Sequence, residues 1–535
     1  MKRCIVFCAA LLQTSQSRCP LNPLCARAKL PLSRKHHSCD TLAPWRLRTG
    51  KRYPPNCASF FALKNAKSHM QPQPQHTTSC IENSSQRINS YPNNFFLWLM
   101  VGCGVILMLI WPVIHTIAFR NILLWVGGII GLGYIIRERS GLYQKPALPL
   151  LFILLFFVWL ITHYFLFSHN PQLELEQIKG LWLRVLLACF LGIGTGLFVR
   201  QYRHAQLIIW TGILSFFVII YGDYVWVSFT INDWNLPYRF DLGILGHKIP
   251  AVFYGLVSLA LACGVISYQL TQVTRIKSHV LIFSMVSIGF TFLAFVITGT
   301  KNGVALGLIL IFSVFVSFLS RANKSFKSIS IASTFIILIC LMSYLHLKIN
   351  PEWNSFFPSV AAGIQINKYP NWQDEQTYGL PVLADGTVVG ASAYLRTAWA
   401  VVGLKLLLEN PLGYGLYNKS FSYLADEDLN LPRSDIIGTH CGWLDFSLGL
   451  GIPGLLLTWT AIALAIFYSF KQVSLWSYTT RWMLAGIFIV WIFSEIFNNH
   501  FIETLFYLIA LLSAGNLPVN AKIPQPVTET PLQSI

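Results

Sequence analysis

Long apolar runs separated by short polar connections dominate the chain after residue 94. A transmembrane helix needs about 20 mostly apolar residues to cross the hydrocarbon core of a bilayer. Runs of this kind occur near 95–114, 118–136, 147–167, 181–199, 206–222, 249–268, 280–299, 303–320, 330–346, 443–469, 480–497 and 501–515. The pattern predicts an all-α polytopic membrane protein with about twelve transmembrane helices.

One connection is far longer than the others and covers residues 347–442, between the ninth and tenth predicted spans. Its segment 391–409 carries Leu395, Trp399, Val402 and Leu406 at helical spacing on one face. Breaker residues in Asn410-Pro411-Leu412-Gly413-Tyr414-Gly415 then end the predicted helix. We therefore expect a large, partly helical loop, and connections of this length are often functional.

The basic residues predict the orientation of these helices. If the N-terminus is cytoplasmic, the cytoplasmic connections carry twelve Lys and Arg residues and the short outer connections carry five. Positive charge is enriched in cytoplasmic connections. Both termini are therefore expected inside, with nine helices over 95–346, an outer loop at 347–442, three helices over 443–515 and a cytoplasmic tail at 516–535.

Composition agrees with a membrane protein and excludes an ordinary soluble enzyme. Of the 535 residues, 54% are hydrophobic and 11% are charged, against about 25% charged in soluble domains. The net charge of +18 arises mostly from residues 1–94, which hold 14 basic and two acidic residues. That segment lacks a sustained apolar period, so we expect a disordered extension or a start assigned too early. With so apolar a chain, the charge indicates a membrane partner and no nucleic acid.

Three ionisable residues are placed by this topology at the outer face, where such groups are functional candidates. They are Lys301 between the seventh and eighth spans, Arg396 on the predicted loop helix, and His440 at the start of the tenth span. Each also has a structural explanation: a snorkelling lysine, an arginine that is solvated or stacked on Trp399, and a structural histidine.

Weaker candidates lie on the same face. The run Asp426-Glu427-Asp428 carries oxygen ligands of the kind that hard cations prefer, but acidic runs are usually solvated, so we expect no metal site. Asp445 lies one turn into the tenth span and could orient a histidine. His247 with Lys248 and His500 with Glu503 are further polar pairs near the ends of spans.

Three motifs, taken together, resemble the family of bacterial O-antigen ligases, O-antigen polymerases and protein O-oligosaccharyltransferases. His440-Cys441, nine residues, and then Gly451-Ile452-Pro453-Gly454 are similar to the ligase signature, with Cys441 where Asn, Ser or Gln is usual. The segment 298–303 resembles the family's Ser-Arg-Gly segment, with Lys301 at the usual arginine. Arg396 and the breaker segment 410–415 resemble the loop helix and its Pro-Gly-Gly exit. The similarity covers about 95–515.

The resemblance implies an O-antigen ligase of the bacterial inner membrane. Such an enzyme moves glycan from undecaprenyl diphosphate to the lipid A-core oligosaccharide at the periplasmic face. His440 would act as the base toward the acceptor hydroxyl, and Arg396 and Lys301 would stabilise the leaving diphosphate. We expect inversion at the anomeric carbon, with no metal and no cofactor.

Three alternatives remain at this level. An O-antigen polymerase or a protein O-oligosaccharyltransferase would use the same lipid-linked donor with another acceptor. A twelve-span transporter or flippase would usually have two six-span halves with the long connection between them and inside. Here the long connection is late and is predicted outside, which favours the transferase.

Overall fold

The structure is a computed structural model that describes residues 95–234, 242–271, 278–319, 353–429, 438–496 and 499–518, with single residues between 333 and 348. Within these ranges every extended element is a helix, and the β-type pairing there is limited to an isolated antiparallel bridge between Val382 and Val388. The predicted all-α class is confirmed for this part of the chain.

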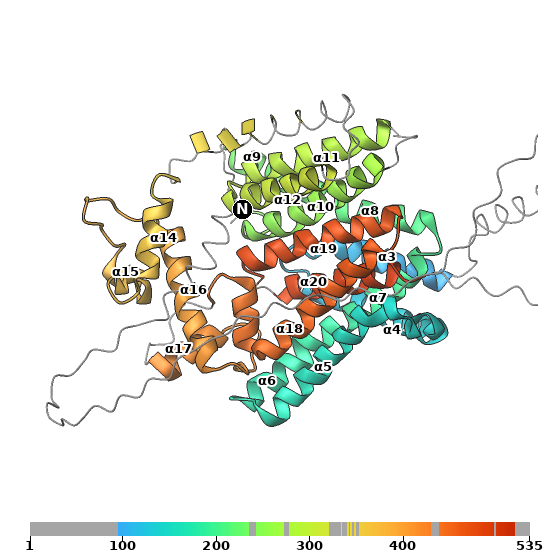
Figure 1. The fold of residues 1–535 in the computed structure, drawn as a ribbon, viewed down its shortest axis with the longest axis horizontal. Coiled ribbons are helices and arrows are strands. Elements are labelled where there is room, and N and C mark those ends of the chain that lie inside the picture. The colour runs from blue at the N-terminus through green and yellow to red at the C-terminus, as the bar shows by residue number, and fades with distance from the viewer. Residues whose placement is uncertain are drawn as a thin grey trace, which may run out of the picture. The chain divides into compact units, whose positions relative to one another are not determined.

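The helices fall into three consecutive groups along the chain (Figure 1). The first group is α3 (Phe95–Ile110), α4 (Ile117–Arg137), η1 (Arg139–Tyr143), η2 (Lys145–Ala147), α5 (Leu148–Leu166), α6 (Pro171–Gln177), the π-helical turn η3 (Ile178–Trp182), α7 (Leu183–Val199), α8 (Arg203–Leu214), α9 (Phe216–Ile231), α10 (Ile249–Thr271), α11 (Ser278–Ile297) and α12 (Lys301–Leu319). The second is α14 (Phe356–Ile364), η6 (Pro370–Gln373), α15 (Glu375–Tyr378), α16 (Ala391–Glu409) and α17 (Ser420–Leu429). The third is α18 (Gly442–Phe470), α19 (Leu475–Phe493) and α20 (Asn499–Gly515).

Eight helices in the described ranges are long and apolar enough to cross a membrane. Seven coincide with predicted spans, and the eighth is α16, which the sequence analysis placed in the long connection. Helices α3 and α20 and the described part of α12 are apolar but shorter. The ninth predicted span, 330–346, lies outside the described ranges apart from single residues. The multi-pass membrane class is therefore supported at this coarser level.

Two helices form the centre of the bundle. The side chains of α20 are buried along almost the whole helix, and α10 is buried to a similar degree. Helix α20 packs most extensively on α7, and α10 packs on α19 and α11. The contact between α7 and α20 depends on Gly192 and Gly196, where an added Cβ would meet the backbone oxygens of Tyr507 and Leu511 at 2.5 Å. Small residues four apart let two membrane helices approach closely.

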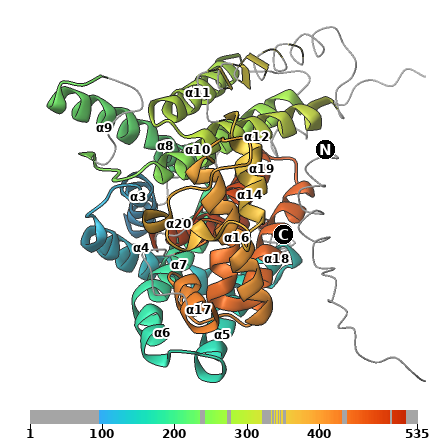
Figure 2. The same ribbon diagram turned by 90° about the vertical axis from the view of Figure 1, so that its left-hand side faces the viewer.

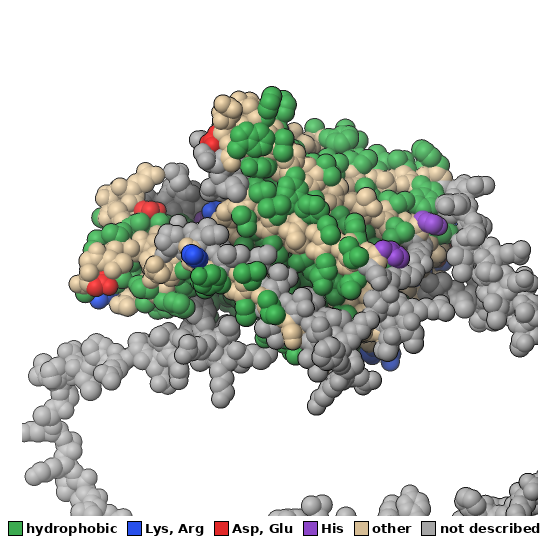
Figure 3. Space-filling view, turned by 90° about the horizontal axis from the view of Figure 1, so that it is seen from above, with side chains coloured by type: hydrophobic (Ala, Val, Ile, Leu, Met, Phe, Trp, Pro, Cys, Tyr) green, Lys and Arg blue, Asp and Glu red, His purple; other side chains and the backbone are tan. Residues whose placement is uncertain are grey.

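The surface over the peripheral helices is strongly apolar. Figure 3 shows hydrophobic side chains spread over the face seen from above. Exposed large apolar residues recur on α9 and α11, among them Val218, Trp226, Phe283 and Val296. An apolar surface this extensive would be unfavourable in water and suits contact with lipid chains.

A second hydrophobic core lies within the segment that follows α12. It is formed by buried residues of α16 and α17, with the first turns of α18 and parts of 362–389. Helix α16 packs on α14 and on α18, and Figures 1 and 2 show α14–α17 together at one end of the bundle. The predicted helix 391–409 is confirmed with the bounds expected from its pattern. This arrangement brings α16 against the residues that precede α18.

Candidate functional site

His440 lies in the turn immediately before α18 and has an unusual backbone conformation. Its φ of 56° is in the left-handed region, which non-glycine residues rarely adopt. The preceding residue, Thr439, is completely buried, and its N–H and hydroxyl groups both donate to the Asp445 carboxylate, at 2.6 and 2.8 Å. Asp445, on the first turn of α18, therefore fixes the turn in a strained conformation of the kind found at functional sites.

The same turn is attached to the end of α19. The Gly442 N–H donates to the carbonyl oxygen of Ser494 at 3.0 Å, and the Cys441 thiol contacts the Ile492 carbonyl oxygen at 3.2 Å. These bonds place Glu495 beside His440, and the Glu495 carboxylate contacts Nδ1 of the imidazole. Glu495 is largely buried, with 11% of its side chain exposed, whereas His440 retains 35%. One edge of the imidazole thus faces a carboxylate while the residue stays accessible.

Helix α16 supplies the third side of this site. The indole of Trp399 is stacked on the imidazole of His440, with ring centroids 5.1 Å apart and an interplanar angle of 26°. The Trp399 ring is itself fixed, since its Nε1–H donates to the carbonyl oxygen of Trp372 at 3.2 Å. Arg396 lies one turn earlier on α16, and its positive charge acts on His440. Among the described residues, the Arg396 guanidinium makes no hydrogen bond.

The surroundings keep His440 neutral at physiological pH. Burial, followed by the positive charge of Arg396, lowers the pKa of His440 to about 4. A neutral imidazole that donates from Nδ1 to Glu495 has its Nε2 lone pair available to accept a proton. The carboxylate would then stabilise the imidazolium that forms. The geometry suits a general base held in one orientation.

Three cations interact in series, and the first of them, Arg396, acts on His440. Lys248 precedes α10, and burial followed by the charge of Arg396 lowers the pKa of Lys248. Lys301, the first residue of α12, is in turn close enough to Lys248 for their charges to interact. The structure therefore links both predicted cations, Lys301 and Arg396, through Lys248. Their mutual repulsion is offset when an anion binds among them, as at a phosphate site.

The two glycine-containing motifs singled out in the sequence pack directly on each other. Backbone N–H groups of Tyr414 and Gly415 donate to the carbonyl oxygens of Leu448 and Gly449, at 2.8 and 2.7 Å. The Ile452 N–H donates to the Pro411 carbonyl oxygen at 2.8 Å. At Gly451 the φ is 73° and the helix α18 is interrupted. These hydrogen bonds join residues 411–415, which follow α16, to the interruption of α18 at Gly451. They therefore fix the position of α16 relative to His440.

The acidic run 426–428 stabilises the same segment. The Tyr414 hydroxyl donates to Glu427 at 2.8 Å, and the Asn410 amide donates to Asp428 at 2.7 Å. In the described part of the chain, no group of three or more His, Cys, Asp or Glu residues is arranged to hold a metal ion. The carboxylates of Glu427 and Asp428 therefore stabilise the segment at the exit of α16.

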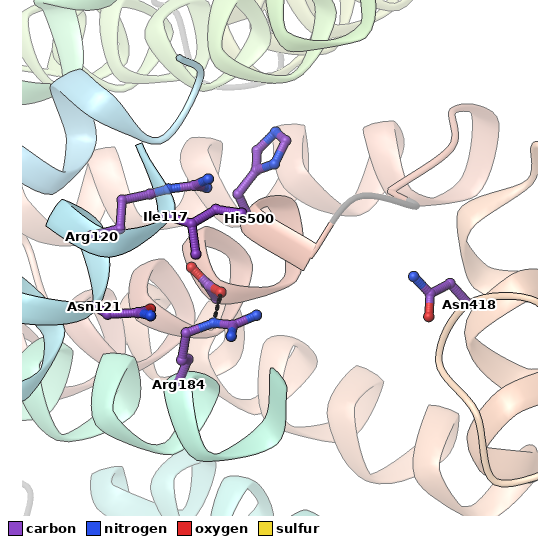
Figure 4. A pocket seen from close by; sticks show the side chains of 7 residues that line it. Ile117, Arg120, Asn121, Arg184, Asn418 and His500 are labelled. Carbon is purple, nitrogen blue, oxygen red and sulfur yellow. Dashed lines mark hydrogen bonds and ion pairs between the residues drawn. The ribbon is translucent and has the colours of Figure 1, made fainter. Parts of the chain in front are cut away.

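A second polar cluster lies where α4, α7 and α20 meet. Arg184 Nε donates to Glu503 Oε1 at 2.6 Å, and Trp111 Nε1 donates to Glu503 Oε2 at 3.1 Å. These partners of Glu503 were not apparent from the sequence. Arg184 and Glu503 line a cavity of about 220 Å³ (Figure 4), together with Ile117, Arg120, Asn121, Asn418 and His500.

Sequence reasoning missed Glu495 and undervalued Lys248. Glu495 lies inside the predicted span 480–497, and an acidic residue within an apolar run is a functional candidate by itself. Its pairing with His440 joins residues 55 positions apart, so it was not visible from spacing. Comparison with known proteins adds no assignment, because no protein-family model and no curated protein matches the chain.

Proposed function

We propose that this protein is a membrane glycosyltransferase of the O-antigen ligase type. It would transfer glycan from a polyprenyl diphosphate, undecaprenyl diphosphate in bacteria, to a hydroxyl of the lipid A-core oligosaccharide. The observation that carries the proposal is the arrangement around His440. This neutral imidazole stacks on Trp399, contacts Glu495 and lies within the electrostatic influence of Arg396.

The chemistry requires a base and a cationic site close together. His440 Nε2 accepts the proton of the acceptor hydroxyl as the hydroxyl oxygen bonds to the anomeric carbon. The bond between that carbon and the diphosphate oxygen breaks, and the lipid diphosphate leaves with the bonding electron pair. Arg396, Lys248 and Lys301 stabilise the negative charge that develops on the leaving group. Direct displacement inverts the anomeric centre.

Glu495 and Trp399 position the base. The Glu495 carboxylate accepts a hydrogen bond from Nδ1–H of the His440 imidazole, and it stabilises the imidazolium once Nε2 has accepted the proton. Stacking on Trp399 fixes the plane of the ring. Both contacts favour a single tautomer with Nε2 directed at the substrate, which is the role expected of positioning residues.

The apolar helices fit a lipid-linked donor. We propose that they lie in the bacterial inner membrane, with the polyprenyl tail in contact with the apolar faces and both termini in the cytoplasm. His440 and the α14–α17 segment would then be periplasmic, which is where a flipped donor and a completed lipid A-core meet. The excess of basic residues in the predicted cytoplasmic connections supports this orientation.

Lipopolysaccharide gels test the proposal directly. A strain without this gene, complemented with wild type, should carry O-chains, whereas complementation with His440→Ala should give uncapped core. Membrane levels of the variant should equal those of wild type. Normal O-chains in the His440→Ala strain would overturn the assignment, and caps of a single repeat would indicate a polymerase. Unchanged caps in the deletion strain would indicate neither enzyme.

A further inference from the structure

The cavity at the ends of α4, α7 and α20 contains a buried arginine, Arg120, that interacts with Glu503 through charge but without a direct hydrogen bond at Nε. Arg120 is only 7% exposed, and its Nε has no hydrogen-bond partner. Arg184 also lines the cavity but is anchored, because its Nε donates to Glu503 at 2.6 Å. The ion pair with Glu503 is formed by Arg184, so it does not explain the presence of Arg120. Burying a guanidinium group whose N–H donor is unsatisfied is costly, and such a group calls for an explanation.

The only lining carboxylate among the described residues is already engaged. Oε1 of Glu503 accepts a hydrogen bond from Arg184 Nε, and Oε2 accepts one from the indole N–H of Trp111. Two guanidinium groups and one carboxylate give these three side chains of the lining a net charge of +1. Glu503 therefore orients Arg184 in the wall but leaves Arg120 without a direct bond to its oxygens. The remaining charge favours an anion in the cavity.

The other side chains around the cavity suit a ligand that both accepts and donates hydrogen bonds. In Figure 4, Arg120 and Arg184 extend from neighbouring helices toward the same space, and Asn418 faces them from the opposite side. The Gln177 side-chain amide donates a hydrogen bond to the side-chain oxygen of Asn418 at 2.8 Å. The side-chain N–H group of Asn418 is therefore the part available to an anion. The Asn121 side-chain oxygen and His500 Nε2 also lack hydrogen-bond partners.

The cavity is separate from the histidine site but adjacent to it. The rings of His500 and Phe501 lie 4.2 Å apart, and Phe501 contacts His247 edge-on at 6.5 Å. His247 immediately precedes Lys248, which interacts with Arg396. Phe501 and the His247–Lys248 segment therefore connect the two positive sites.

We propose that this cavity is a binding site for a phosphate group, with Arg120 and Arg184 as its main ligands and Asn418 and His500 at its edge. The group would be a free phosphate ion or the phosphate of a lipid headgroup. Binding here needs no turnover, so the proposal stands or falls independently of the transfer chemistry.

Isothermal titration calorimetry on the full-length protein in dodecylmaltoside tests this site. Inorganic phosphate and dihexanoylphosphatidylglycerol are titrated separately at constant ionic strength. We expect wild type to bind at least one of them, and Arg120→Gln to bind it about tenfold or more weakly, since charged hydrogen bonds are lost. Arg137→Gln is the matched control, because Arg137 is an exposed arginine at the other end of α4. It should bind like wild type.

The two probes identify the source of the phosphate. Tighter binding of the lipid indicates a headgroup site, and equal or tighter binding of inorganic phosphate indicates a site for the free ion. Absence of binding by wild type to both probes, or equal affinity of Arg120→Gln and Arg137→Gln, overturns the proposal. If Arg120→Gln fails to fold, Arg184→Gln removes the other main ligand and the net positive charge of the lining, so it should also weaken binding about tenfold; affinity equal to that of Arg137→Gln overturns the proposal.

Discussion

At the residue scale, the protonation of His440 depends on two charges that act in opposite directions. Burial, followed by the charge of the Arg396 guanidinium, lowers the pKa of His440, whereas the Glu495 carboxylate favours the protonated form. In the proposed mechanism the His440 imidazole is neutral before it accepts a proton, and the Glu495 carboxylate stabilises the imidazolium that results. Each charge can be removed separately, so each has a distinct kinetic consequence.

The pH dependence of transfer should report on the imidazole. His440 can accept a proton only when neutral, and its pKa is lowered to about 4. Activity should therefore be constant near neutral pH and fall as the pH decreases through about 4. Replacing Arg396 by Ala removes a positive charge, so the pKa should rise and the acid limb should move to higher pH. The measurement is initial rate against pH with saturating lipid-linked donor; an unchanged limb in that variant would contradict the coupling.

Glu495→Gln keeps the size of the side chain and removes its charge. We expect transfer to fall by about tenfold to a hundredfold, because a charged hydrogen bond to the imidazolium contributes about 1.5–3 kcal/mol. Donor binding should change little, since Glu495 contacts the base and not the cations. Glu409→Gln is a suitable control, because Glu409 is an exposed acid at the end of α16. An effect on donor affinity as large as that on rate would argue against a positioning role.

Variants of the three cations should have kinetic effects that differ from those of variants at His440. Arg396→Ala and Lys301→Ala should impair donor binding or turnover, and Lys248→Ala should do so as well, because the three charges interact. Arg396→Lys should restore only part of the activity, since an ammonium cannot form the bidentate contact of a guanidinium. Turnover at the wild-type level in any of the alanine variants would remove that residue from the proposed diphosphate site.

At the scale of elements, the site depends on how the exit of α16 meets the interruption in α18. Both segments were prominent in the sequence for their glycine and proline residues. Their contact was not predictable, because the hydrogen bonds join residues 411–415 to 448–452 across the fold. The close approach explains why both sides contain glycine: a Cβ at Gly451 would collide with the carbonyl oxygen of Leu412.

Gly451→Ala should therefore destabilise the protein. The added methyl group meets backbone atoms of Leu412, and the φ of 73° is itself unfavourable for alanine. We expect a loss of about 1–3 kcal/mol, measured as a lower unfolding midpoint in detergent. Gly133→Ala is the control, since nothing lies within 4 Å of the added Cβ and α4 is a regular helix there. Its midpoint should be unchanged or raised slightly.

At the scale of the whole molecule, the distribution of charge and apolar surface predicts a topology. Peripheral helices expose apolar side chains, and the basic residues favour cytoplasmic connections on one side. The segment between α15 and α16, residues 379–390, and the connection between α18 and α19, residues 471–474, should then lie on opposite sides of the membrane.

Alkaline phosphatase fusions in bacteria test this topology, because the reporter folds only outside the cytoplasm. Inserted near Asp385, in an exposed turn, it should be active; inserted at Lys471–Ser474 it should be inactive. A fluorescent protein, which is bright only in the cytoplasm, should give the reverse result. Activity at the second position and not at the first would reverse the orientation and exclude a periplasmic His440.

Sequence alone determined the class of the protein and most of its helices, because apolar length and helical periodicity are local properties. Runs such as 118–136 and 249–268 correspond to α4 and α10, and the pattern of 391–409 predicted α16 to the residue. Sequence also selected His440, Arg396 and Lys301 as ionisable residues at the predicted outer face. By length and hydropathy α16 is also among the membrane-length helices, although its sequence was assigned to the long connection.

Only the tertiary structure decided which polar groups meet. The Glu495 carboxylate contacts His440 because α19 ends against the turn before α18. Glu503 pairs with Arg184, 319 positions away, because glycines bring α7 and α20 into close contact. Pairings of this kind depend on helix packing, which is set by the shapes of side chains far apart in sequence. Hydropathy therefore determined how many helices to expect, and packing decided which charges share a site.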